Sequence, residues 1–336
     1  MSKSKFVLFG AVFIFLFCAF ISIQIGSADC SFKPPLYLLQ NNLSESCQAI
    51  LRLRVLRVTG AMAVGAGLSI SGSVLQRLLR NPLADSFVLG ISSSGTCFAV
   101  VGMILLSALN YAVQSFHLAS LALIGSFVAL LFLLGARKLL KLNDDAFALP
   151  LLGLMINSFS GAVLMFAVAF LAPQQLGEAY RWMVGAMRLL SEVEVSMLWL
   201  VLIISSALLI YFMPALNALS FGDEFANSLG FHSKKIRIYC FLMVAILAAF
   251  MVAAAGTVGF VGLIVPHFVR ILVPENARIE GVCSLFFGAA LVSVSDLLAR
   301  TLFLPAELPV GVFTALIGAP CLAVILFQKA RILRAV

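Results

Sequence analysis

Charged residues are scarce in this sequence. Asp, Glu, Lys and Arg make up 11% of its 336 residues, hydrophobic residues make up 62%, and the mean hydropathy is +1.13. A soluble globular domain carries about 25% charged residues. The scarcity of charge therefore excludes that class and indicates a polytopic membrane protein.

The sequence also lacks the motifs of a self-sufficient pump or enzyme. It has no GxxxxGK[ST] loop to cradle nucleotide phosphates, no HExxH motif, and no CxxC or Cys/His cluster with metal-ligand spacing. Ionisable residues are nearly absent from the middles of its apolar runs, apart from Asp296 and Arg300, whose spacing allows an intrahelical ion pair. We therefore expect no catalytic or metal site and no bound cofactor. A proton-coupled carrier, which needs a relay of acids or histidines, is disfavoured.

Apolar residues occur in runs long enough to be membrane-spanning helices. A helix needs about 20 residues to cross the hydrocarbon core, and the runs are too long for barrel strands. Ten runs lie near residues 6–26, 56–76, 89–109, 116–136, 146–172, 194–214, 239–256, 258–273, 281–304 and 309–327. We predict an all-α polytopic fold of about ten transmembrane helices, forming one domain over residues 1–336, with the first helix retained.

The positions of Lys and Arg predict the orientation, because cytoplasmic loops are enriched in both. With ten spans and the N-terminus inside, only seven of the 22 basic residues fall outside: Lys33, Arg52, Arg54, Arg57, Arg181, Arg188 and Arg300. Both termini are therefore predicted to be cytoplasmic. The net charge of +8 is explained by this asymmetry and by anionic lipid headgroups, so no nucleic-acid partner is expected.

Small residues recur on two predicted helices. Such residues let helix backbones approach closely in lipid, and they share one face in each case. They are Ala61, Gly65, Ser69 and Gly72 in the second span and Gly311, Ala315 and Gly318 in the tenth. Tight helix contact is favoured for both stripes over a pore-lining role.

The seven cysteines fall into two groups. Five lie in or near apolar spans and are expected to be small core residues: Cys18, Cys97, Cys240, Cys283 and Cys321. Cys30 and Cys47 both lie in the first predicted external loop. A disulfide between them and two free thiols both remain open at this point.

One amphipathic segment, residues 215–231, interrupts the apolar runs on the predicted cytoplasmic side. Apolar residues alternate with polar ones around Leu219, and Gly222 and Gly230 can each end a short helix in the left-handed conformation. We predict two short helices in the plane of the membrane interface. An ordinary amphipathic loop lying on lipid is the alternative.

Several stretches resemble the FecCD-like, type II permeases of ABC importers for iron-siderophore complexes, haem and cobalamin. The resemblance spans nearly the whole chain, and the order and spacing of the motifs make it specific. The motifs are Arg54-Val-Leu-Arg57, Gly72-Ser-Val-Leu-Gln-Arg-Leu-Leu-Arg-Asn-Pro-Leu-Ala-Asp85, Leu219-Ser-Phe-Gly-Asp-Glu-Phe-Ala-Asn-Ser-Leu-Gly230, Gly259-Phe-Val-Gly-Leu-Ile-Val-Pro-His-Phe-Val-Arg270, Asp296-Leu-Leu-Ala-Arg300 and Pro305-Ala-Glu-Leu-Pro-Val-Gly311.

The resemblance implies a cobalamin-importer-permease-like fold and a multi-pass subunit of the bacterial inner membrane. Such a subunit pairs with a second copy of itself around a central path, above two cytoplasmic ABC ATPases that use ATP and Mg, and below a periplasmic binding protein. Coupling helices at about 215–231 would seat in the ATPase. The residues implied for this contact are Leu219, Gly222, Asp223, Glu224, Leu229 and Gly230.

The resemblance also implies two further sites. Arg54, Arg57 and Arg300 match the arginines that dock the binding protein, with Arg300 able to bond Asp296 and still point outward. The path is expected along the second, fifth and tenth spans, with its gate at the turn before the fifth. The path and gate candidates are Asp144, Asp145, Met155, Asn157, Ser158 and Met165, although simple packing is an equal alternative for each path residue.

We therefore expect a non-enzymatic permease that imports a metal chelate, with ferric siderophore first and haem, cobalamin or another metal complex as alternatives. An ion-coupled secondary carrier is the rival from another class. The sequence alone leaves the cargo open, and also whether the partner is an identical or a related permease.

Overall fold

The computed structural model describes residues 3–26, 45–111, 113–139, 148–274 and 276–334. In these residues the chain forms twelve α-helices and no strand. The helices are α1 (Lys3–Gln24), α2 (Glu45–Leu78), α3 (Ile91–Ala108), α4 (Ser115–Leu139), α5 (Ala148–Val168), α6 (Pro173–Val184), α7 (Glu192–Ser220), α8 (Asp223–Ser228), α9 (Ser233–Ala255), α10 (Val261–Leu272), α11 (Ala277–Thr301) and α12 (Val310–Arg334).

Ten of these helices correspond to the ten predicted spans. Eight are long and apolar enough to cross a membrane, and two shorter apolar stretches, α10 and residues Val310–Val324 of α12, account for the others. The predicted all-α polytopic fold is confirmed. The two extra helices, α6 and α8, lie between predicted spans.

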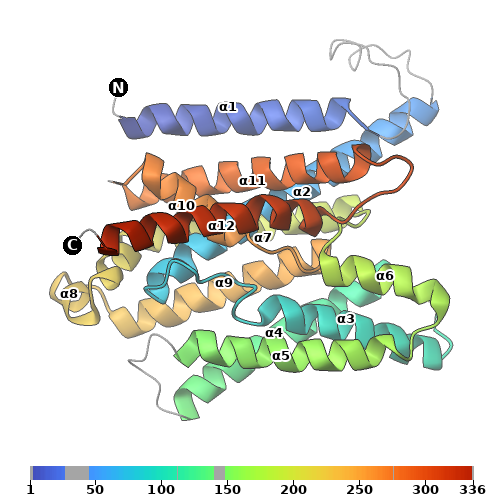
Figure 1. Ribbon diagram of the computed structural model, residues 1–336, viewed down its shortest axis with the longest axis horizontal. Coiled ribbons are helices and arrows are strands. Elements are labelled where there is room, and N and C mark those ends of the chain that lie inside the picture. The colour runs from blue at the N-terminus through green and yellow to red at the C-terminus, as the bar shows by residue number, and fades with distance from the viewer. Residues whose placement is uncertain (1–2, 27–44, 112, 140–147, 275, 335–336) are drawn as a thin grey trace.

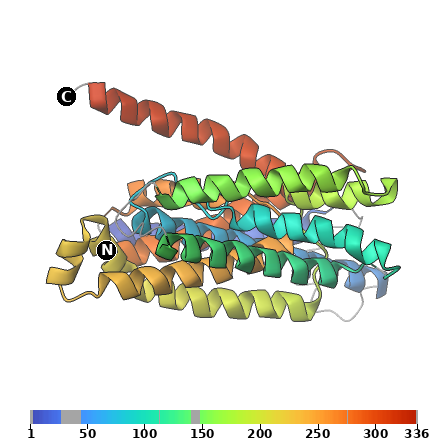
Figure 2. The same cartoon turned by 90° about the horizontal axis from the view of Figure 1, so that it is seen from below.

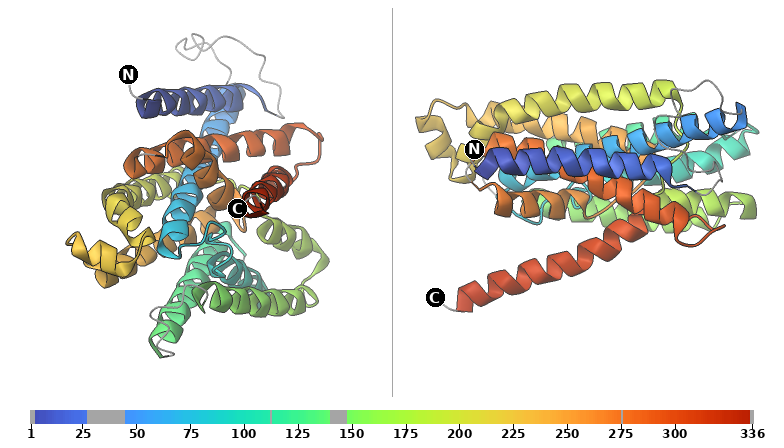
Figure 3. Two further views of the ribbon diagram at one scale, coloured as in Figure 1. Left: turned by 60° about the vertical axis from the view of Figure 1, so that its left-hand side comes forward. Right: turned by 90° about the horizontal axis from the view of Figure 1, so that it is seen from above.

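The helices run roughly along one common direction, so the molecule has two ends (Figure 1). We call them the α8 end and the α6 end, after the short helices that lie there. The start of α1 and the end of α12 both lie at the α8 end. Towards that end, α12 leaves the bundle and stands apart from the other helices (Figures 2 and 3).

Helix α2 is the centre of the subunit, packed against α1, α7, α9, α10 and α11. Its small residues allow this packing: a Cβ on Gly65 would lie 2.1 Å from Gly288 O in α11, and one on Gly72 would lie 1.8 Å from Gly262 O in α10. The interpretation of this stripe as tight helix contact is therefore confirmed. Residues Gly60 to Leu78 of α2 are buried inside the subunit. They are therefore not exposed on its outer surface, contrary to the expected path along the second span.

The glycines of the tenth span also make close contacts. A Cβ on Gly311 would lie 1.8 Å from Val184 O, and one on Gly318 would lie 2.4 Å from Phe260 Cβ. These contacts hold the start of α12 against the end of α6 and the segment before α10. The packing interpretation holds for this stripe as well.

Helix α6 was not predicted, because its 12 residues are amphipathic and form no apolar run. Pro173 opens it at a position where the missing N–H costs no hydrogen bond. Gln175 Oε1 accepts from Ala172 N (3.2 Å), which satisfies a further donor. The next helix, α7, begins with a capping box in which Ser191 and Glu194 accept from each other's backbone N–H groups.

The prediction of two short interfacial helices was half wrong. Helix α7 continues through Pro214 to Ser220, and only α8 is a separate short helix. Leu216 and Leu219 are fully buried, so they extend the packed face of α7 and do not lie on lipid. Gly222 (φ 135°) and Gly230 (φ 85°) flank α8 with positive φ, which L side chains rarely adopt.

The cysteines follow the predicted grouping where the structure describes them. Cys18, Cys97, Cys240, Cys283 and Cys321 are free thiols, and three of them are buried. Cys47 is disulfide-bonded. Cys30 lies outside the described residues, so its pairing with Cys47, one of the two alternatives left open by the sequence, stays untested.

Candidate functional site

The predicted coupling segment forms an exposed knob at the α8 end of the molecule. Phe221 is 73% exposed, and Phe225 and Leu229 are also exposed, although all three are large and apolar. Glu224 is exposed beside them. Leu219 differs from the other predicted coupling residues, because its side chain is 0% exposed and cannot touch a partner.

Asp223 fastens this knob to the body of the subunit. Its carboxylate accepts hydrogen bonds from Arg80, in the turn after α2 (Nη2 to Oδ1, 2.9 Å), and from Arg237 in α9. Both arginines are also bound to backbone: Arg80 Nε donates to Leu219 O (3.0 Å) and Arg237 Nη1 to Leu78 O (2.6 Å). Asp223 therefore faces inward as an anchor, while Glu224 and the apolar side chains face outward.

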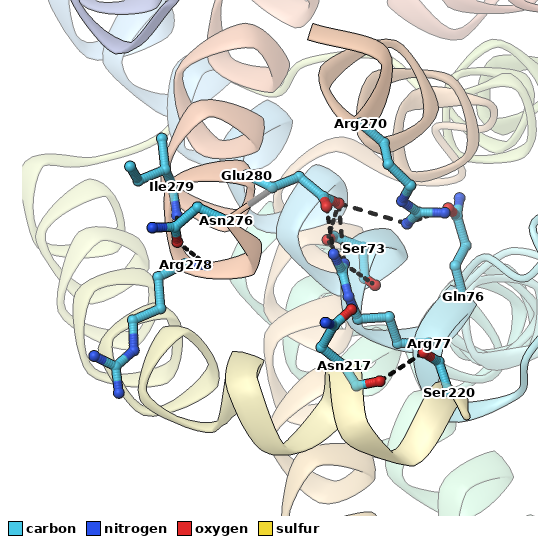
Figure 4. A network of polar contacts seen from close by, with 10 residues as sticks. All are labelled: Ser73, Gln76, Arg77, Asn217, Ser220, Arg270, Asn276, Arg278, Ile279 and Glu280. Carbon is cyan, nitrogen blue, oxygen red and sulfur yellow. Dashed lines mark hydrogen bonds and ion pairs between the residues drawn. The ribbon is translucent and has the colours of Figure 1, made fainter. Parts of the chain in front are cut away.

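A second, buried polar network lies one turn earlier, at Arg77 of α2, and was not predicted. Figure 4 shows Arg77 and Arg270 converging on Glu280, the first acidic residue of α11. Arg77 and Glu280 are both buried. These residues lie near helix ends, whereas an ionisable residue is conspicuous in a sequence only in the middle of an apolar run. Their spacing of 203 positions leaves no local signal.

A third network lies towards the α6 end and joins α2, α11 and the turn before α12. Arg57 donates to Asp296 Oδ1 (Nε, 3.1 Å) and to Glu307 Oε2 (Nη1, 3.1 Å). Arg300 Nε lies 3.5 Å from Asp296 Oδ2, which bears out the predicted intrahelical pair. Arg57 is nevertheless the closer partner of Asp296, because it forms the shorter, hydrogen-bonded contact.

The three predicted docking arginines are not equally accessible. Arg300 is 3% exposed and donates through Nη2 to Ser22 O of α1. The expectation that its remaining donors point outward was therefore wrong. Arg54 is 8% exposed and donates to Gln24 O (3.4 Å). Of the three, Arg57 lies nearest to open space, because it lines a cavity.

This cavity has a volume of about 680 Å³ and lies between the starts of α2 and α4, α6, the α6–α7 segment and the turn before α12. Arg57, Arg181 and Arg188 line it together with Glu178 and Glu307. It is a polar depression at the α6 end, large enough for a small molecule or for side chains of a partner.

The predicted path residues of α5 divide into two kinds. Met155, Ser158 and Met165 are exposed on an outer face. Asn157 instead fastens α5 to the segment between α2 and α3: its Nδ2 donates to Phe87 O (3.0 Å) and Val88 O (3.2 Å), and its Oδ1 accepts from Ser93. For Asn157 the packing alternative therefore holds. The gate candidates Asp144 and Asp145 lie outside the described residues.

One carboxylate in the α2–α3 segment has an unusual environment. Asp85 is buried, and its Oδ1 accepts from Ser86 N (2.7 Å) and Ser86 Oγ (3.3 Å). Burial raises the pKa of Asp85 to about 6, because desolvation of the charged form outweighs these two hydrogen bonds. The same oxygen would lie 2.3 Å from a Cβ on Gly262, so Asp85 packs against the first turn of α10.

Among the residues that the structure describes, no group of three or more His, Cys, Asp or Glu side chains could hold a metal ion. The charged side chains of the three networks are paired with one another across helices. They can bind, position and transmit motion.

The chain is similar to known proteins of one family. Residues 14–328 match the model of the FecCD transport family. The chain is 33% identical over 322 residues to the Fe(3+)-citrate import system permease protein YfmD of Bacillus subtilis, covering 95% of this chain and 94% of that one. It is 32% identical to the hemin transport system permease protein HmuU of Yersinia pestis (89% and 88% covered) and 35% identical to the vitamin B12 import system permease protein BtuC of Vibrio vulnificus (81% and 80%).

A solved structure agrees with these relatives. An inward-facing metal-chelate type ABC transporter superposes with a TM-score of 0.80 at 26% identity, covering 97% of this chain and all of that one. The match includes nearly every helix described above. The chain therefore belongs to the FecCD transport family and is the permease of a metal-chelate type ABC importer.

Proposed function

We propose that this permease imports an iron chelate of the ferric siderophore type, driven by a cytoplasmic ABC ATPase and supplied by a periplasmic binding protein. The α8 knob carries the ATPase part of this proposal. Large apolar side chains at an exposed helix tip, anchored from behind by Asp223, are the arrangement expected of an element that inserts into a protein groove. ATP and Mg would be bound by the partner, in keeping with the lack of a phosphate-binding loop in this chain.

The orientation follows from the same element. The α8 end carries basic residues beside the knob, among them Arg80, Lys234, Lys235 and Arg237, as a cytoplasmic face should. The α6 end, with its polar cavity, would then face the periplasm. Both termini would be cytoplasmic, in the inner membrane of a bacterium.

A second copy of the chain would complete the path. Helix α5 exposes large apolar side chains, including Met155, Phe159, Met165 and Phe166, and α12 stands away from the bundle. A weakly polar wall of this kind lets a bulky chelate pass without holding it. In a homodimer, α5 and α12 of the two copies would enclose such a path.

The knob is tested by charge reversal. Glu224→Lys should abolish co-purification of the ATPase subunit in mild detergent, because it places a cation among the outward-facing residues of α8. The matched control is Glu45→Lys, an exposed acid at the start of α2 near the α6 end, which should leave ATPase binding unchanged. Equal binding by both variants would contradict the coupling role of α8.

Reconstituted transport tests the cargo and the energy source. Vesicles holding the permease, the ATPase and the binding protein should take up a ferric siderophore only with ATP and Mg. A panel of ferric siderophores, ferric citrate, haem and cobalamin compares the cargo classes. Uptake driven by an ion gradient without ATPase would replace this proposal with a secondary carrier.

The dimer is tested by cross-linking. Phe159→Cys on the exposed face of α5 should form a disulfide between two copies, whereas Leu131→Cys on the exposed face of α4 should not. Both positions are apolar and exposed, so lipid contact alone would treat them alike. Cross-linking at Leu131→Cys and not at Phe159→Cys would assign the dimer contact to another face.

A further inference from the structure

The buried network at the α8 end joins three helices through one carboxylate. Glu280, 2% exposed in the first turn of α11, accepts hydrogen bonds from both terminal nitrogens of Arg77: Nη1 donates to Oε1 (3.0 Å) and Nη2 to Oε2. Arg270, in the last turn of α10, lies 3.5 Å from the same carboxylate. Ser73 Oγ also donates to it (3.4 Å). The ends of α2, α10 and α11 are therefore held together by a bidentate, directional contact.

Gln76 extends this contact to the first turn of α10. Its Nε2 donates to Gly262 O and Leu263 O, both at 3.2 Å, and its Oε1 accepts from Arg270 Nη2 (3.3 Å). Helix α10 is thus fixed to α2 near both of its ends. It is only 12 residues long, so these contacts restrain most of its length.

Stability alone does not explain this network. Desolvation of buried charges offsets much of their attraction, and apolar residues of similar volume often replace such pairs without loss of stability. An apolar contact is less directional, so it fixes the relative position of two helices less strictly than hydrogen bonds do. A bidentate Arg–carboxylate pair fixes both the distance and the angle between its helices.

The network continues directly into the α8 knob. Arg77 and Arg80 lie three positions apart at the end of α2. Arg77 binds Glu280 on one side, and Arg80 binds Asp223 and Leu219 O on the other. A displacement of α8 would therefore move the end of α2, and α2 would move α10 and α11 with it.

We propose that Arg77 and Glu280 are positioning residues for energy coupling, which transmit the movement of α8 to α10 and α11. This inference rests on the proposed function, since it requires an ATPase that moves α8. Without the pair, the end of α2 loses its charged contact with α11, and a movement of α2 is passed on to α11 less completely. ATP is then hydrolysed without the corresponding movement of the membrane helices.

The test uses the complete transporter in vesicles, with the ATPase and the binding protein, under conditions in which the wild type shows ATP-dependent uptake. The variants are Glu280→Gln, which keeps the shape of the side chain, and the double variant Arg77→Met with Glu280→Leu, which replaces the pair by apolar volume. We expect normal ATPase binding and ATP hydrolysis, with uptake per ATP reduced by about 2- to 30-fold, the range that corresponds to typical coupling energies.

The matched control is Arg278→Gln. Arg278 is a basic residue of the same turn of α11, but it is exposed and directed away from Glu280 (Figure 4). Its replacement removes one positive charge at this end without touching the Arg77–Glu280 pair and should leave uptake per ATP unchanged. A further variant, Arg77→Lys, keeps the charge but loses the bidentate contact and should give an intermediate value.

Three outcomes would overturn the inference. Wild-type uptake per ATP in the folded double variant would show that the pair transmits nothing. Loss of ATPase binding in Glu280→Gln would assign the network to assembly instead. If the double variant does not fold, wild-type uptake per ATP in Glu280→Gln gives the same refutation. Failure of the wild type to pump with ATP would contradict the proposed function, and the two failures are thereby distinguished.

Discussion

Gly72→Ala should destabilise the contact between α2 and α10, although alanine has a higher helix propensity than glycine. The new Cβ would lie 1.8 Å from Gly262 O, a backbone atom, whereas real Cβ contacts are essentially never shorter than 3.0 Å. No side-chain rotation relieves such a contact. The two helices must separate, because the contact has to lengthen from 1.8 Å to at least 3.0 Å.

The magnitude follows from two effects. Overpacking of a close contact costs about 1–3 kcal/mol. Separation also stretches the hydrogen bonds from Gln76 to Gly262 O and Leu263 O, both already 3.2 Å long, and each is worth about 0.5–1.5 kcal/mol. We therefore expect a loss of about 2–6 kcal/mol, of which the gain in helix propensity recovers at most about 1 kcal/mol.

The assay is the melting temperature of the purified permease in detergent, followed by the loss of its monodisperse peak. A loss of this size should lower it by several degrees, since about 1 kcal/mol corresponds to 2–4 °C in a domain of 150–250 residues. The control is Gly135→Ala in α4, where nothing lies within 4 Å of the new Cβ; it should melt at the wild-type temperature or slightly above it, because Ala has the higher helix propensity. Equal melting of the two variants would refute the argument from close packing.

Three further predictions concern other parts of the molecule. The pKa of Asp85 is raised from 3.8 to about 6, so protonation of its carboxyl group favours the folded state. This contribution to stability is fully present below about pH 4 and is lost as the pH rises through 6. Asp85→Asn should remove this step of about 3 kcal/mol from the pH dependence of stability, and an unchanged profile would contradict the assignment. Non-reducing proteolysis should release Cys30 and Cys47 as one linked peptide, whose reduction costs about 3 kcal/mol of stability; linkage of Cys47 to another cysteine would be the contrary result. Arg57→Gln should weaken association of the periplasmic binding protein by at least about tenfold and leave ATPase binding intact. Arg300→Gln, at a buried position, should mainly lower the melting temperature. A pull-down in which Arg300→Gln loses the binding protein and Arg57→Gln keeps it would contradict this.

The spanning helices were predictable because the bilayer imposes the same requirement on each of them. An apolar run of about 20 residues has few alternatives to a helix in a hydrocarbon core, so ten runs gave ten helices. Helix α6 was not predicted, because its 12 amphipathic residues form no apolar run long enough to span a membrane. The single α8 in place of two short helices had a similar cause, since the buried face of α7 continues to Leu219.

The functional residues were predictable in kind but less so in role. Motif order located α8, Asp223 and the arginines at the opposite end. It did not show that Asp223 faces inward, or that Arg300 is buried against the backbone of α1. A charge near a helix end can point to solvent, to lipid headgroups or to a neighbour, and only the packed neighbours decide among them.

The amino-acid sequence by itself determined the membrane class, the ten spans, their small-residue contact faces and the family, because each depends on composition or on local spacing. The tertiary structure decided which charges meet. Arg77 and Glu280 are separated by 203 positions, and Arg300 and Ser22 by 278. Such contacts depend on which helices pack against one another. Because the helices are similarly apolar, this packing is a property of the assembled bundle and not of any one segment.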